Sequence, residues 1–185
     1  MVNKMARNQE ISGAQKMEKV SSMKEISIGS LVLHGSSADP QKLERLRKLL
    51  KLVSKQEPTQ TLARKRIPAF KIRPGLHIGY KVTIKKNINE LLQNLFIAAH
   101  TFKKKQFNSG FLSFGVKEYI EIPGLTYQRD IGIMGFDATV NLKRKGFRVK
   151  LRKLKKSEVG KKHKITKEET LKFFTDNFKL NIEEK

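Results

Sequence analysis

The chain has 185 residues, and its 40 Lys and Arg residues against 17 Asp and Glu residues give a formal net charge of +23. Such an excess repels itself in a free globule, so it indicates a polyanionic partner, of which nucleic acid is the leading candidate. The lack of cysteine excludes disulfides, thiolate metal sites and a thiol nucleophile, and no apolar run approaches the ~20 residues that a membrane-spanning helix needs.

The first third of the chain predicts an arm, a strand and a helix. Residues 1–22 are polar and are expected to form a flexible arm. Strand-forming residues over 25–33 predict the first strand. Asp39-Pro40 is a helix-start signal, and apolar residues spaced by three and four predict a helix over 40–54. A short second strand over 59–63 follows.

The middle of the chain alternates strand and helix patterns. The clearest period-two alternation lies over 78–84, and Asn87 with Glu90 predicts a capping box at the start of the next helix. The expected elements are a strand over 78–84, a helix over about 88–104, a strand over about 111–122, a loop over 125–132 and a strand over about 133–142.

A strongly basic segment over 143–164, here called the strap, precedes the last predicted helix. Twelve of its residues are Lys or Arg, and only Glu158 is acidic. Such a run usually stays extended until it meets phosphate. Thr166 and Glu169 predict a capping box for a helix over about 167–179, so the strap should be fastened at both ends.

This order of elements predicts an α+β fold of the split βαβ type, with helices on one face of an antiparallel sheet and one extra strand. The other sheet face is expected to be partly polar and free to meet a ligand. The expected domain organisation is the arm 1–22, an RNA-binding domain over 23–142, and the strap with the last helix, 143–180, as part of the same domain.

Residues 64–75, here called the hairpin tip, are a candidate projecting loop, because two prolines and a glycine interrupt them and five are basic. Phe70 lies among these cations. Aromatic rings and Arg planes stack on unpaired bases, which is a common route to RNA recognition. The alternative is that Phe70 packs onto the core, and the local sequence leaves both open.

Two rival functions are open. A nucleoid-type DNA-binding protein would share the basic character. Asp130 and Asp137, with Glu118 or Glu121, could ligate a metal in a nuclease, although ordinary surface carboxylates are favoured. We find no nucleophile–base pair and expect no catalysis, no metal and no cofactor.

Six phrases in register carry a resemblance over about residues 23–180. They are MKEI (23–26) leading to VL (32–33), IPAFKIRPG (67–75), IGYKVTI (78–84), FGVKEYI (114–120), DIGIMGFD (130–137) and KGFRV (145–149). Together they resemble the universal L-five family of large-subunit ribosomal proteins, called L-eleven in eukaryotes. The tail over 162–169 is similar to the archaeal and eukaryotic branch. One departure is Glu57, an acid where the family has a base.

The resemblance implies a structural protein of the cytoplasmic ribosome, placed in the central protuberance of the large subunit, with no membrane partner. It implies contacts with 5S rRNA, large-subunit rRNA, the P-site tRNA and protein S-thirteen of the small subunit. The expected 5S rRNA contacts are Lys24, Gln56, Gln60, Thr61, Arg64 and Lys65. The expected tRNA-facing residues are Phe70, Lys71, Arg73 and Pro74. The expected rRNA contacts of the strap are Lys143, Arg144, Lys145, Arg148, Lys150, Arg152, Lys153, Lys155, Lys156, Lys161, Lys162 and Lys164.

Overall fold

The structure is a computed structural model that describes residues 22–183. The predicted arm therefore lies, apart from Ser22, outside the described residues. The helices and strands, in chain order, are β1 (Ile26–Ser36), α1 (Pro40–Ser54), β2 (Thr59–Leu62), β3 (His77–Ile84), α2 (Ile88–Ala99), β4 (Phe102–Lys103), β5 (Phe107–Asn108), β6 (Phe111–Val116), β7 (Phe136–Arg144), α3 (Arg148–Leu151), α4 (Lys167–Phe178) and β8 (Ile182–Glu183).

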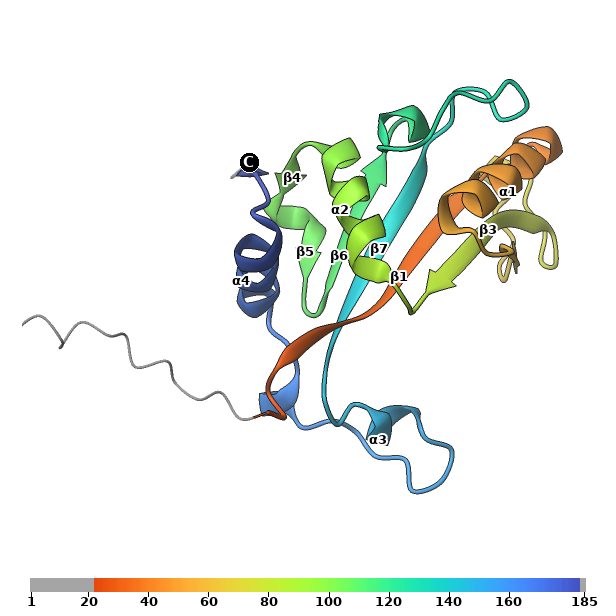
Figure 1. Cartoon of the computed structure of the whole chain (residues 1–185). Helices are drawn as coiled ribbons and strands as arrows, with labels where there is room; N and C mark the ends of the chain where they lie inside the picture. The colour runs from red at the N-terminus through yellow and green to blue at the C-terminus, as the bar shows by residue number, and fades with distance from the viewer. Residues whose placement is uncertain (1–21, 184–185) are drawn as a thin grey trace, which may run out of the picture.

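A six-stranded antiparallel sheet organises the molecule, in the order β2-β3-β1-β7-β6-β5. Helices α1 and α2 cover one face, and α4 lies beside the β5 edge (Figure 1). The predicted α+β fold of the split βαβ type is confirmed. Strand β7, which corresponds to the last predicted strand (133–142), lies directly beside β1. It is therefore the fourth strand of the split βαβ motif, and β6 is the strand added outside the motif.

Alternation along the strands separates an apolar face from a polar one. In register with Leu33 of β1 lie Val82 of β3 and Ala138 of β7, and all three side chains are buried against the helices. The next position, His34, lies in register with Lys81 and Asp137 on the opposite face. The helices therefore pack on one side only.

Helix α2 ends at Ala99, five residues before the predicted end. His100 adopts a positive φ of 55°, and the amide of Phe102 then donates to the carbonyl of Asn181 (3.2 Å). Pairing of β4 with β8 thus replaces the last helical turn. Phe102 still reaches the core, with its ring 5.4 Å from that of Phe96.

Strand β6 ends at Val116 rather than at the predicted 122. A 3₁₀ turn over Tyr119–Glu121 follows, and it buries Tyr119 completely and leaves Ile120 exposed. The Tyr119 hydroxyl accepts a hydrogen bond from the amide of Gln128 (2.8 Å). The predicted strand was therefore too long, because the chain turns after Val116 and buries Tyr119 instead of Ile120.

The capping prediction at Asn87 was also wrong. Asn87 has a φ of 51°, and its side chain makes no hydrogen bond to the start of α2. An N-cap normally has extended backbone geometry, so the left-handed conformation moves the side chain away from the free amides. The capping box of Thr166 and Glu169 at α4 is confirmed.

The strap is folded, which corrects the prediction that it is extended. Its first two residues complete β7, the helix α3 follows, and the amide of Ser157 donates back to the carbonyl of Val149 (3.3 Å). A 3₁₀ turn over Lys161–His163 leads towards α4.

Arg144 fastens the two ends of the strap together. Its side chain is only 6% exposed, and Nη2 donates to Oε1 of Glu169 at 2.7 Å. Nη1 donates to the carbonyl of His163 (3.3 Å), while Nε has no partner among the described residues. Among residues 22–183, no helix has the length and apolarity required to cross a bilayer.

We predict that Arg144→Ala lowers the free energy of unfolding by about 2 kcal/mol, because it removes charged hydrogen bonds at a buried position. Urea denaturation followed by circular dichroism measures this change. The control is Lys172→Ala, an exposed change on α4, which should stay within about 0.5 kcal/mol of the parent. Equal stability of the two variants would contradict the fastening role of Arg144.

The pKa of Glu169 is lowered, chiefly because the Thr166 amide donates to its carboxylate and also because Arg144 lies beside it. A lowered folded-state pKa gives stability that is present above the unfolded pKa of about 4.3 and is lost as the pH falls. We therefore predict that Glu169→Gln lowers the melting temperature at pH 7 and flattens its fall between about pH 5 and 3.

Thermal melts across that pH range test this prediction. Glu168→Gln, which changes the exposed neighbouring carboxylate in the same turn, serves as the control and should keep the parent's slope. A Glu169→Gln protein that follows the parent at every pH would rule out this contribution.

Candidate nucleic-acid interface

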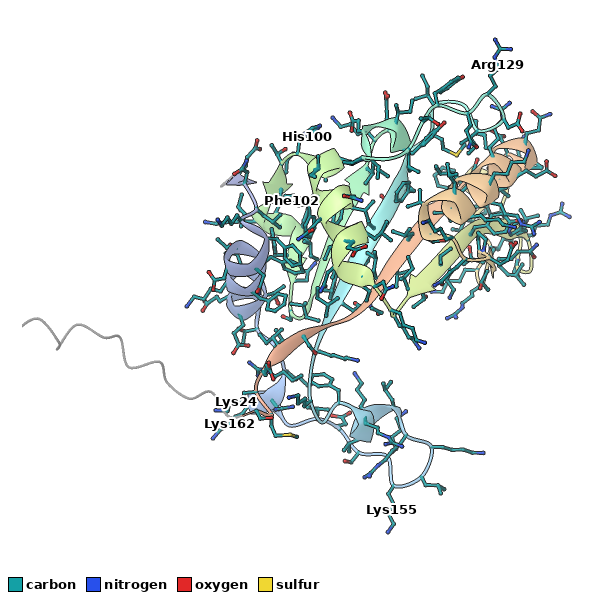
Figure 2. The ribbon with its side chains drawn as sticks, viewed as in Figure 1. Lys24, His100, Phe102, Arg129, Lys155 and Lys162 are labelled. Carbon is teal, nitrogen blue, oxygen red and sulfur yellow. The ribbon has the colours of Figure 1, made fainter. Side chains whose placement is uncertain are left out.

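The cationic segments lie at opposite ends of the sheet. At one end Ile26 of β1 pairs with Arg144, where the strap begins, and at the other Ser36 pairs with Gly79, near the hairpin tip. The 11 residues of β1 span about 35 Å. Figure 2 shows Lys155 projecting from the strap and Arg129 from the opposite extreme of the molecule.

The hairpin tip is ordered by its own backbone. Ile67 and Ile72 exchange two hydrogen bonds, of 3.0 and 3.1 Å, around a single 3₁₀ turn over Pro68–Phe70. Lys71 then takes a left-handed φ of 54°, and its amide donates to the carbonyl of Pro68 (2.9 Å). Short-range bonds therefore shape the segment, which packs few side chains.

Phe70 projects into solvent with 68% of its surface exposed. The alternative in which this ring packs onto the core is therefore wrong. Lys71, Arg73 and Pro74, the other residues expected to face tRNA, are also exposed. An exposed ring beside two cations is a surface on which an unpaired base can stack.

Four of the six expected 5S rRNA contacts lie together near this end. Gln60 and Thr61 are on β2, in register with Tyr80 and Gly79 of β3. Arg64 and Lys65 follow β2 and are exposed. Gln56 is exposed too, but it lines a cavity with Ile84 and Asn87 at the opposite end of β3.

Lys24 is separated from this group. It lies just before β1, at the strap end of the sheet, where Figure 2 shows it near Lys162. The carboxylate of the neighbouring Glu25 forms an ion pair with Lys145 of the strap (3.0 Å). Lys24 therefore belongs spatially to the strap and not to the β2 group.

Thr61 and Gly79 form a tight contact between β2 and β3. A Cβ at Gly79 would lie 2.5 Å from the carbonyl oxygen of Gly35 and 2.9 Å from Oγ1 of Thr61. Only glycine fits there. The Thr61 hydroxyl is buried and has no hydrogen-bond partner among residues 22–183.

Glu57, the departure from the family pattern, is neutralised within the chain. Its carboxylate pairs with Lys51 and lies 3.6 Å from Arg47, both on α1. The Lys51 hydrogen bond is the largest cause of the lowered pKa of Glu57. This acid therefore does not present an unpaired negative charge next to Gln56.

Eleven of the twelve strap cations expected to contact rRNA are exposed. Arg144 is the exception, since its guanidinium is buried against Glu169, and it serves the fold. Lys145 has an ion-pair partner in Glu25, and Arg152 donates to the carbonyl of Lys155 (2.7 Å).

The sheet face opposite the helices, here called the open face, joins the two basic ends. Within residues 22–183 no helix covers it (Figure 1). Its polar side chains bond to one another, as in Ser113 with Thr139 (2.9 Å) and Asn141 with Ser30 (3.3 Å). These four residues were not identified from the sequence. Their alternation with apolar residues along the strands would have placed them on the solvent-facing side of the sheet.

The loop between β6 and β7, residues 117–135, has a different character. It carries three acidic and two basic residues, and its exposed large apolar side chains include Tyr127 (55%) and Ile133 (70%). Asp130 lies 3.6 Å from Lys48. No three His, Asp or Glu side chains gather to hold a metal in the described part of the chain, so nothing there supports the nuclease alternative.

Comparison with known proteins adds independent information. Residues 77–173 match the family model that describes the C-terminus of the ribosomal L-five family. The chain is 38% identical to the large ribosomal subunit protein uL5 of Caldivirga maquilingensis, over 86% of this chain and 83% of that protein. It is 37% identical to uL5 of Nanoarchaeum equitans, over 86% and 97%, and 35% identical to uL5 of Picrophilus torridus, over 87% and 94%.

We predict opposite effects of removing two phenylalanine rings. Phe70→Ala should change the free energy of unfolding by less than about 0.5 kcal/mol, because the ring is exposed. Phe174→Ala should cost about 3–5 kcal/mol, since Phe174 is fully buried with the rings of Phe96 and Phe107 each 6.1 Å away. Urea denaturation of both variants tests this, and a comparable loss in both would show that Phe70 packs on the core.

Proposed function

The chain belongs to the ribosomal L-five family and is a structural protein of the large ribosomal subunit, and we propose that it binds 5S rRNA there through the hairpin end of its sheet. The archaeal relatives support its place in the archaeal and eukaryotic branch. This role is structural and involves no catalytic step.

The observation that carries the proposal is the cluster formed by β2 and the base of the hairpin. Arg64 and Lys65 can neutralise phosphates, and the exposed amide of Gln60 can form directional hydrogen bonds. Thr61 supports this surface from within, because its hydroxyl is buried beside Gly79. This cluster borders the open face, whose hydroxyl and amide groups suit the 2′-hydroxyl groups of RNA. We leave Lys24 out of the 5S contact and assign it to the strap.

The exposed residues Phe70, Lys71, Arg73 and Pro74 extend beyond this cluster, and we assign them to the P-site tRNA. The support is the projection and order of the hairpin tip, since a loop held by its own hydrogen bonds loses little entropy on binding. The tip and the 5S cluster are consecutive along one hairpin, so the two RNAs would be held by neighbouring surfaces.

The strap, without Arg144, contacts large-subunit rRNA in this proposal. Its exposed cations lie on a segment that is already folded, and each phosphate contact contributes to the affinity through counterion release.

We assign the contact with protein S-thirteen to the loop over 117–135. Its near balance of charge and its exposed Tyr127 and Ile133 favour a protein over a polyanion.

The proposed boundaries are the domain 23–142 with the strap and last helix, 143–180, as one unit. The support is that Ile165 and Phe174 are buried in the same core cluster as β1, β6 and β7.

We predict that the protein prefers 5S rRNA to duplex DNA and to scrambled RNA of equal length at ~0.2 M salt, where nonspecific phosphate binding has weakened. Arg64→Glu with Lys65→Glu should remove most of that preference, because the charges lie at the proposed contact. Filter binding across a salt series measures both effects.

The charge-matched control is Lys172→Glu with Lys179→Glu on and just after α4, far from the hairpin (Figure 1). This control should slightly weaken binding to all three nucleic acids and keep the preference for 5S rRNA. Parent binding that collapses equally for all three would favour a generic DNA-binding or polyanion-binding protein instead.

A further inference from the structure

A cavity of about 680 Å³ lies between the strap and the neighbouring end of the sheet. The turn between β5 and β6, the end of β7 and both runs of the strap line it. Its volume falls within the range of about 300–1,000 Å³ that is typical of pockets for small molecules. Its position is at the opposite end of the sheet from the proposed 5S cluster.

The walls of this cavity are held in place without a ligand. The amide of Gly110 donates to the buried Thr170 hydroxyl (3.0 Å), and the amide of Leu142 donates to the Gly110 carbonyl (2.8 Å). On the strap side, a ring nitrogen of His163 lies 2.8 Å from the carbonyl of Lys145, and the rings of Phe147 and His163 lie 5.7 Å apart. Binding would therefore require little ordering.

The lining combines aromatic and apolar walls with cations. Phe111 and Phe147 contribute rings, and Leu151, which is 83% exposed, lies at the rim. Lys150 and Lys164 are exposed and can meet phosphates. Glu158 is the one carboxylate in the lining. Because a carboxylate only accepts hydrogen bonds, it suits an exocyclic amino group and disfavours a phosphate inside the cavity.

We propose that this cavity captures an unpaired nucleobase of the bound rRNA, stacked on Phe111, with the flanking phosphates on Lys150 and Lys164. The inference rests on the proposed contact between the strap and rRNA and makes it more specific. An apolar side chain of a protein is the competing occupant, but Lys150 and Lys164 line the cavity and the strap carries further exposed cations, which a polyanion complements.

The test separates base stacking from phosphate attraction. The probes are a single-stranded RNA of adenosine and cytidine, about 12 nucleotides long, and the same strand with its central bases removed. Both strands carry the same phosphates, so their affinity ratio reports the bases. All proteins carry Phe70→Ala, so the hairpin tip adds no stacking. We expect the intact strand to bind about tenfold tighter to this parent.

Phe111→Ala in that background should reduce the ratio to about one, while the slope of log affinity against log salt stays unchanged. Lys150→Ala with Lys164→Ala should instead lower the salt slope by about two phosphate contacts. Tyr127→Ala is the matched control, because it removes another exposed ring remote from the cavity, and it should keep the tenfold ratio. Phe111→Leu, which keeps an apolar wall, should lose most of the ratio and guards against a folding defect.

A parent ratio of one, as expected if a protein side chain fills the cavity, would overturn the inference, as would a tenfold ratio that survives Phe111→Ala. Neither probe is 5S rRNA, so the nucleobase cavity and the 5S rRNA contact can each be refuted without the other. A base-dependent ratio with no 5S preference would leave the cavity assignment standing and refute the 5S contact. The reverse result would refute the cavity assignment alone.

Discussion

The ion pair between Arg144 and Glu169 is the contact on which the basic end of the molecule depends. It joins the last residue of β7 to the first turn of α4, and the segment between them carries most of the cations of that end. A buried guanidinium is stable only where acceptors are supplied, and the strap carbonyls that turn towards it supply them. The strap thus acquires a defined path although it contains few apolar residues.

The arrangement of charge explains how a protein with a net charge of +23 can remain folded. The strap and the hairpin tip carry 17 of its 40 Lys and Arg residues at the two ends of the sheet. The open face between them carries hydroxyl and amide groups together with the oppositely charged Lys81 and Asp137. Repulsion between the ends is weakened by a distance several times the Debye length of about 8–10 Å. The buried face remains apolar, so the core is separated from the charged surface.

Local patterns predicted much of this fold, and contacts between distant residues account for the errors. Helix α1 spans its predicted residues, because Pro40 and the spacing of its leucines are local signals. The end of α2 was misplaced because Phe102 pairs with Ile182, near the other end of the chain. Likewise, composition located the cations, but only the strand pairings show that Lys24 and Gln60 lie at opposite ends of β1 and that Arg144 points inward.

The short outer strands of the sheet have a consequence for the free protein before assembly. Strand β2 has four residues and β5 has two, and Arg64, Lys65 and Arg66 follow β2 after one intervening residue, Ala63. Short, charge-flanked edges are poor templates for pairing with a second sheet. Before assembly, a newly made chain is therefore protected against pairing its edge strands with those of other copies. The cations beside β2 contribute to this protection, because like charges on two copies repel each other.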